Sequence, residues 1–188
     1  KKLKKDVLKT QNSFSSEWSE VNDDSHAWGR SPEIRLGEFK SRMEIELRDL
    51  KNKLILDAGC GNGEVELGLK DSGAEIFAID LSFSVDSLKD KISKIKTGNG
   101  TIIHLIQSDI INSPIQDNLC DFVFSDGVIH HTRSVYEGLK GLTSKVSANG
   151  KCFVFVYSHD HKKILDRITY HAYRIMRLLT LKIPHKLL

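Results

Sequence analysis

The sequence predicts a doubly wound α/β fold, in which a mostly parallel sheet carries helices on both faces. Short apolar runs alternate with segments of helical periodicity between residues 53 and 157. The runs are apolar throughout, as in strands that are buried on both faces. A loop containing Gly59, Gly61 and Gly63 separates the first run from the first helical segment, where bare backbone allows a tight turn or the close approach of a ligand.

The elements are predicted in chain order from capping residues and periodicity. A first helix is expected over residues 32–50, because Ser31 can cap it and Pro32 suits its first turn. Its apolar face consists of Leu36, Phe39, Met43, Leu47 and Leu50. Strands are then predicted at 53–59, 75–80, 101–109, 120–127 and 150–157, and helices at 64–73, 84–95 and 134–146.

The ends of the chain differ from this central part, so three regions are predicted: an arm at 1–31, a core at 32–158 and a helix at 159–188. The arm is polar, yet it contains Phe14, Trp18 and Trp28. Such aromatic residues need a surface to cover, so we expect the arm either to close over a ligand as a lid or to pack on the outer helices. The last region is basic and amphipathic, which favours packing on its own domain or a second copy over contact with a membrane surface or a phosphate-rich partner.

Composition excludes several classes of protein. The net charge of +3 is too small to indicate nucleic-acid binding by itself. Three cysteines without CxxC spacing indicate neither a disulfide framework nor a zinc site, and the pair His159 and His161 lacks a clear third ligand, so no metal is expected. No apolar run approaches the length of a membrane span and no signal peptide is visible, which predicts a cytoplasmic protein.

The polar chemistry of the sequence lies where the predicted strands end, which is where doubly wound sheets bind ligands. Asp57, Asp80 and Asp109 stand at three of these ends. The loop is no P-loop, because Glu64 and Val65 follow its last glycine in place of Lys and Ser or Thr. Its G-x-G-x-G spacing and the acid before it also disfavour a nicotinamide dinucleotide. Three acids beside an open backbone suit a nucleoside that carries positive charge and no phosphate.

Five segments in this order and spacing resemble the class I S-adenosylmethionine-dependent methyltransferases: LILDAGCGNGEV, EIFAIDLS, IQSDI, DFVFSDGVIHHT and KVSANGKCFVFVY. The resemblance covers residues 53–157, and the GVIHHT stretch is most similar to the small-molecule branch, of the methyltransferase domain 11 or 25 type. It implies a Rossmann-like fold, S-adenosylmethionine as cofactor and S-adenosylhomocysteine as product. Since no two strand patterns follow residue 157, we expect the last two of that family's seven strands to be missing.

The same resemblance implies the roles of the strand-end residues. Asp57 and the glycine loop contact the methionine part, Asp80 the ribose hydroxyls and Asp109 the adenine amine, and residues 125–127 form the floor near the sulfonium. The implied cofactor-binding set is Asp57, Ala58, Gly59, Cys60, Gly61, Gly63, Asp80, Leu81, Ser108, Asp109, Ile110, Ser125, Asp126, Gly127 and His130. Asp80 and Asp109 could instead be ordinary helix caps, and Cys60 is a small filler of a tight loop.

The expected reaction is direct displacement of the methyl group from the sulfonium onto a small-molecule or metabolite-linked sugar or lipid acceptor. His130 is the candidate general base, although alignment of donor and acceptor is the larger effect and His130 can equally line the pocket or cap a helix. The Asn or Asp with two prolines typical of nucleobase-amine methyltransferases is absent, so no DNA acceptor is expected. The alternatives are a module that binds cofactor or a partner without turnover, an RNA methyltransferase or a nicotinamide oxidoreductase.

Overall fold

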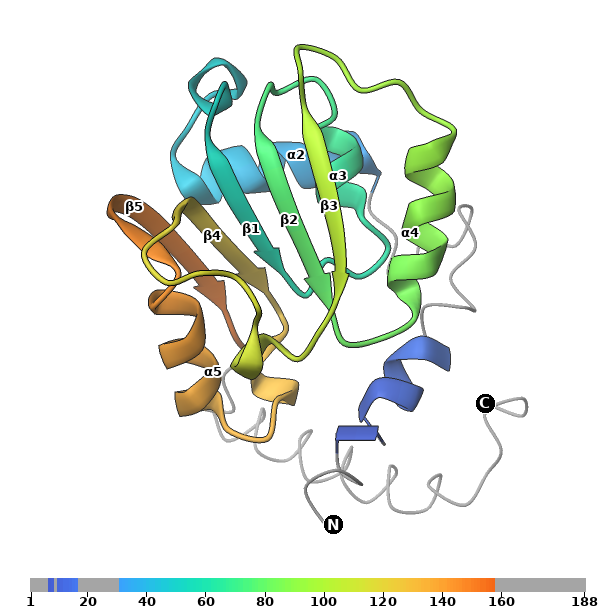
Figure 1. Cartoon of the computed structure of the whole chain (residues 1–188), viewed down its shortest axis with the longest axis vertical. Coiled ribbons are helices and arrows are strands. Elements are labelled where there is room, and N and C mark those ends of the chain that lie inside the picture. Colours follow the sequence, from blue (N-terminus) through green and yellow to red (C-terminus); the bar gives the residue numbers. More distant parts are fainter. Residues whose placement is uncertain (1–6, 9, 17–30, 158–188) are drawn as a thin grey trace, which may run out of the picture. The chain divides into compact units, whose positions relative to one another are not determined.

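A computed structural model describes residues 7–8, 10–16 and 31–157 of the chain. Its strands are β1 (Leu54–Ala58), β2 (Glu75–Asp80), β3 (Ile102–Gln107), β4 (Cys120–Asp126) and β5 (Val146–Phe155). All four neighbouring pairs are parallel, in the order β3-β2-β1-β4-β5 (Figure 1). The predicted doubly wound α/β fold is therefore confirmed.

Helices cover both faces of this sheet. The α-helices are α2 (Pro32–Met43), α3 (Glu64–Gly68), α4 (Ser84–Ser93) and α5 (Val135–Thr143), and the short 3-10 helices are η1 (Leu47–Leu50), η2 (Ile110–Asn112) and η3 (Ile129–His131). Contacts divide the chain into two compact units, Lys1–Val156 and Tyr157–Leu188, and these elements belong to the first. The helix predicted at 159–188 and the arm residues Trp18 and Trp28 lie outside the described residues.

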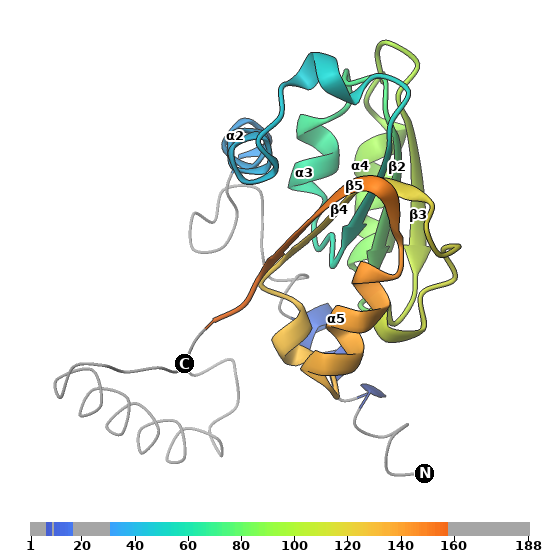
Figure 2. The same ribbon diagram turned by 90° about the vertical axis from the view of Figure 1, so that its left-hand side faces the viewer.

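The centre of the sheet is buried on both faces because successive side chains of a strand point in opposite directions. Ile55 and Leu56 are both fully buried, yet they belong to different cores. Ile55 packs with Phe39 of α2 on one face, and Leu56 packs with Leu142 of α5 on the other. Figure 2 shows α2 and α5 on opposite sides of the strands.

The prediction of one helix over residues 32–50 is wrong beyond Met43. Ser31 caps α2 as expected, its Oγ accepting a hydrogen bond from the N–H of Ile34 at 3.4 Å. At the other end Glu44 adopts a left-handed conformation, with φ 53°, and its neighbour Ile45 donates to the carbonyl of Lys40. The apolar residues of 47–50 continue the pattern in sequence, but they belong to the separate helix η1.

Two other boundaries differ from the sequence prediction. The helix expected at 64–73 ends at Gly68, where a Cβ atom would lie 2.7 Å from the carbonyl oxygen of Pro32. This close approach lets α3 pack against the start of α2. The strand β5 begins at Val146, four residues before the predicted start, because its pairing with β4 continues through a bulge opposite Cys120 and Phe122.

The order of the strands alone predicts where a ligand crevice lies. β1 lies between β2 and β4, and the direction in which the chain winds reverses between β1 and β4. In such sheets ligands bind beyond the carboxyl ends of the strands at this switch point. The glycine loop follows β1 and residues 127–134 follow β4, so both border the crevice.

Candidate functional site

The glycine loop joins β1 to α3 in a conformation that its sequence makes possible. Gly59, Gly61 and Gly63 have φ values of 95°, 53° and 80°, in the region that other residues rarely adopt. A Cβ atom on Gly59 would lie 2.2 Å from Cγ2 of Val128, and one on Gly63 would lie 2.1 Å from Cδ1 of Leu88. Two of the three glycines thus allow the loop to pack against its neighbours.

Asp80, at the end of β2, holds this loop in place. Its Oδ2 accepts a hydrogen bond from the N–H of Gly61 at 3.0 Å, and its Oδ1 accepts from the N–H and the hydroxyl of Ser82 at 2.8 and 2.6 Å. An ionised carboxylate has about four acceptor positions, so three donors leave room for one more. The Asp80 residue remains 9% exposed, which fits a hydroxyl of a bound ribose.

Asp109, beyond β3, is both a cap and a candidate ligand contact. Its Oδ1 accepts from the N–H of Ile111 at 3.0 Å at the start of η2, so the expected capping role is present. No group in the described part of the chain donates to Oδ2. The register pairs Asp80 with Gln107, and the N–H of Ser108 donates to the Asp80 carbonyl, which brings the ends of β2 and β3 together.

The polar residues at the end of β4 form hydrogen bonds with other residues of the protein. Ser125 is fully buried and its hydroxyl donates to the carbonyl of Ala58 at 2.9 Å. The carboxylate of Asp126 accepts hydrogen bonds from Arg35, at 2.7 Å, and from Arg42, both on α2. Burial acts to raise the pKa of Asp126, but these two guanidinium groups outweigh it and hold the pKa below its usual value.

The contacts of Asp126 with Arg35 and Arg42 fix α2 against the end of β4. Arg42 also lies over the rings of Phe153 and Phe155 of β5, at 5.3 and 5.8 Å from their centroids. The sequence pattern placed Asp126 near the cofactor but did not identify Arg35 and Arg42 as its partners. No local pattern links them to Asp126, because they lie 91 and 84 positions away from it in the sequence.

A histidine pair and the arm meet beyond β4. The rings of His130 and His131 are 4.0 Å apart, and Phe14 of the arm contacts His131 edge-on at 4.9 Å. The hydroxyl oxygen of Ser15 accepts from the N–H of Phe83, beyond β2, at 3.0 Å. Residues 14 and 15 therefore connect the loop after β2 with the loop after β4. Partial burial lowers the pKa of His131, so this ring is neutral at pH 7.

Two carboxyl groups are buried together beneath the glycine loop. Asp57, the last but one residue of β1, is 3% exposed, and Glu66 of α3 is completely buried. Burial raises the pKa of Asp57 to about 7, although the hydrogen bond with Glu66 and the charge of Arg35 lower it. Burial and the charge of Asp57 raise the pKa of Glu66 well above its usual value. Glu66 was not singled out from the sequence, although a carboxylate next to buried Val65 breaks the apolar pattern of its helix.

Neither Cys60 nor the described residues of metal-ligating types indicate further chemistry at this site. Burial raises the pKa of the Cys60 thiol well above its usual value, so the thiol stays protonated and packs as a small apolar group. Within residues 7–8, 10–16 and 31–157 no three His, Cys, Asp or Glu side chains are arranged to hold a metal ion. His159 and His161 lie outside these ranges.

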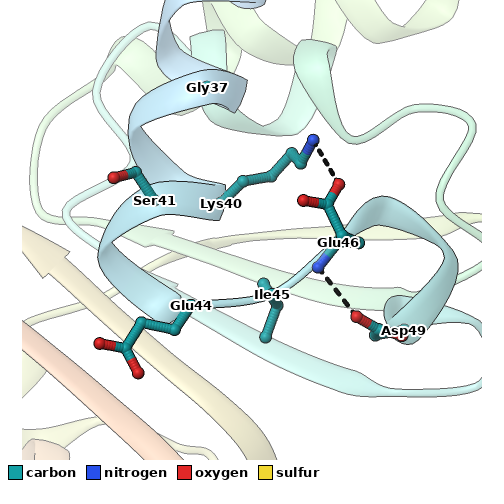
Figure 3. Close-up of a pocket in the computed structure, with 7 residues that line it drawn as sticks. All are labelled: Gly37, Lys40, Ser41, Glu44, Ile45, Glu46 and Asp49. Carbon is teal, nitrogen blue, oxygen red and sulfur yellow. Dashed lines mark hydrogen bonds and ion pairs between the residues drawn. The ribbon is translucent and has the colours of Figure 1, made fainter.

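A hollow on the surface lies away from these residues. It is lined by residues of α2, of η1 and of the link between them, as Figure 3 shows. Lys40 forms an ion pair with Glu46 at 2.7 Å, and the N–H of Glu46 donates to Asp49 at 2.9 Å. Because η1 precedes β1, the hollow lies toward the amino ends of the strands, opposite the glycine loop.

The strand ends fit S-adenosylmethionine in their chemistry. The molecule offers two ribose hydroxyls, an adenine amine and two positive charges, and it has no phosphate. Asp80 has a free acceptor position, Asp109 has an oxygen without a donor among the described residues, and Asp57 supplies negative charge when ionised. Leu81, which follows Asp80, is half-buried, whereas Ile110 is 5% exposed and belongs to the core.

Comparisons with known proteins agree with this chemistry. A family model described as "Methyltransferase domain" matches residues 56–154. The tRNA U34 carboxymethyltransferase of Vibrio cholerae serotype O1 is 30% identical in an alignment of 165 residues that covers 81% of this chain and 50% of the relative. That of Aliivibrio salmonicida is 34% identical in an alignment of 160 residues that covers 78% of this chain and 49% of the relative. The chain thus spans about half the length of these curated relatives.

Solved structures share the fold. A SAM-dependent methyltransferase from Aquifex aeolicus is similar with a TM-score of 0.57 and 21% identity, covering 88% of this chain and 85% of that one. Magnesium protoporphyrin IX methyltransferase from Synechocystis, solved with bound SAM, has a TM-score of 0.55 and 20% identity and covers 75% of this chain and 72% of that one. At these identities the likeness concerns the fold alone. Among the described residues no helix has the length and apolar character needed to cross a membrane.

Proposed function

We propose that this chain, which belongs to the methyltransferase domain family, is an S-adenosylmethionine-dependent methyltransferase whose acceptor is a base of transfer RNA. The observation that carries this choice is the identity of 30% and 34% to two relatives named for uridine 34 of tRNA. The likeness extends beyond the cofactor motifs, since it covers about four-fifths of the chain. The acceptor originally favoured by the sequence, a small molecule, becomes the second candidate.

In this proposal the cofactor lies across the carboxyl ends of β1, β2 and β3. Asp80 accepts a hydrogen bond from a ribose hydroxyl at its remaining position, and Oδ2 of Asp109 accepts from the adenine amine beside Leu81. The loop from Asp57 to Gly63 surrounds the methionine part. Support comes from the hydrogen bond that Asp80 accepts from the N–H of Gly61, which joins this carboxylate to the loop. Bound here, the sulfonium supplies an electrophilic methyl group.

The chain's own contribution to transfer is then alignment and, for some acceptors, removal of a proton. The residues beyond β4 face the switch point, so an acceptor base reaches the donor from this side. His130 stays the proposed general base. His131 is a second candidate, since its ring is next to that of His130 and its lowered pKa keeps it neutral. A neutral imidazole can accept a proton, whereas an imidazolium cannot.

A small-molecule acceptor is favoured by one observation, the resemblance of the GVIHHT stretch to the small-molecule branch of the family. One experiment separates the candidates. The chain is incubated with methyl-labelled S-adenosylmethionine and either total tRNA, DNA or a metabolite pool free of nucleic acid. The tRNA is then digested to nucleosides, whose masses show which base carries the labelled methyl group.

We expect label in a uridine derivative of tRNA and none in DNA, and the label should be much reduced with Asp80→Ala. Label confined to the metabolite pool would overturn the tRNA proposal in favour of the small-molecule reading. Binding of the cofactor with no label in any acceptor would overturn it in favour of a module without turnover.

A further inference from the structure

Glu66 occupies an unusual position for an acidic side chain. It is completely buried in the first turns of α3, directly after the glycine loop. No N–H or hydroxyl group within the described residues reaches either of its carboxyl oxygens. The carboxyl group of Asp57 is its neighbour, and each of the two groups acts on the pKa of the other. A buried charge without partners is strongly unfavourable, so a solely structural account gives no reason for Glu66.

A hydrogen bond between two carboxyl groups needs a proton on one of them, because an ionised carboxylate only accepts. Two neighbouring carboxyl groups in a buried site cannot both be ionised. The proton belongs with Glu66 for a geometric reason. Glu66 has no exposed surface, whereas Asp57 keeps 3% and stands at the end of β1, where the ligand crevice begins. The less solvated group is the one that remains neutral.

We propose that Glu66 is a positioning residue: as a neutral carboxylic acid it donates a hydrogen bond to Asp57 and thereby keeps that carboxylate ionised and directed at the positive charge of the cofactor. Glu66 itself contacts no ligand. The inference rests on the cofactor placement proposed above, because it requires the methionine part to lie beside Asp57.

Other charged and titratable groups act on this pair from every side. Asp80 and Asp126 act on Asp57 with negative charge, and Arg35 acts on it with positive charge. Glu64 acts on Glu66 from the same helix. The Cys60 thiol remains protonated beside them. Arg35 is itself occupied by Asp126 and Glu38, so within the described residues the pair has no cation of its own. A cationic ligand would supply that charge.

The proposal predicts a pH dependence whose sign follows from the raised pKa of Asp57. A cation binds best to the ionised form, so affinity for S-adenosylmethionine should rise with pH through about 7 and then level off. Removing the donor at position 66 raises the pKa of Asp57 further, which moves this rise to higher pH. The test measures the dissociation constant by calorimetry from about pH 6 to about pH 9, a range that spans this pKa.

Two variants of Glu66 separate positioning from packing. Glu66→Gln keeps a donor of similar shape, and its pH profile should match that of the wild type. Glu66→Met fills the space without a donor. It should bind about fivefold more weakly at pH 7, the effect of one unit's rise in a pKa that starts at about 7, and within about twofold of the wild type at the alkaline end. Asp57→Asn should lose the rise in affinity that comes from Asp57. Any pH dependence that its affinity still shows then belongs to titration of the ligand. Thermal melting without cofactor verifies that each variant folds.

A measurement on the wild type and Glu66→Gln does not depend on the methionine variant. Infrared spectroscopy at about pH 8, well above the usual carboxyl range, should show the carbonyl stretch of a protonated carboxylic acid that Glu66→Gln lacks. No such band, or equal pH profiles for Glu66→Met and the wild type, would overturn the role of Glu66. Equal affinities of Asp57→Asn and the wild type at every pH would instead show that the cofactor placement is wrong.

Discussion

Gly59 has a positive φ and lies against Val128, so a side chain there meets both a backbone and a packing conflict. Gly59→Ala should lower the free energy of unfolding by about 2–4 kcal/mol, from the left-handed conformation and overpacking together. Urea denaturation measures this. Gly37→Ala is the matched control, because α2 is helical there and nothing lies within 4 Å of the new Cβ atom. It should stabilise by about 0.5–1 kcal/mol. Similar losses in both variants would contradict the packing account of Gly59.

Asp80 combines a structural and a binding role, which one substitution cannot separate. Asp80→Ala should weaken S-adenosylmethionine binding by about 1–3 kcal/mol and also lower stability, because the N–H of Gly61 loses its acceptor. Ser82→Ala removes the hydroxyl contact to Oδ1 together with two contacts to Ser84, and it should lower stability while affinity stays within about twofold of the wild type. If Asp80→Ala bound the cofactor normally in its folded fraction, Asp80 would be a structural residue only.

The arm is the element whose role the sequence left most open. Phe14 contacts His131 and Ser15 contacts the backbone of Phe83, so residues 14 and 15 connect the loops on two sides of the crevice. We expect the arm to close over the bound cofactor and exclude water. Phe14→Ala should then raise the dissociation rate of S-adenosylmethionine about tenfold, since it removes an aromatic contact and its buried area.

Stopped-flow displacement measures this rate, with Leu8→Ala as control, because Leu8 is an exposed residue of the same arm. Saturating cofactor should also protect the lysines of the first ten residues from trypsin. Unchanged dissociation together with unchanged cleavage would leave the arm a packing role alone.

Over the whole molecule, the strands were predictable because residues such as Ile55 and Leu56 must both be buried in a parallel sheet. Glycine and acid spacing also indicated which strand ends bind the cofactor, and this stays a prediction. The break at Glu44 was not predictable, since the apolar spacing continues through it into η1. Nor were the ion pairs of Asp126, because they join α2 to β4 across most of the described chain. Contacts of this kind depend on the assembled fold and leave no periodic signal.

The central claim is that the carboxyl ends of β1, β2 and β3 bind a cationic nucleoside. Calorimetric titration of the chain with S-adenosylmethionine, S-adenosylhomocysteine and a nicotinamide dinucleotide, each repeated with Asp80→Ala, tests it most directly. The account predicts that the first two bind with one molecule per chain, that Asp80→Ala weakens both, and that the dinucleotide does not bind. Binding of the dinucleotide without binding of S-adenosylmethionine would contradict the account at its foundation.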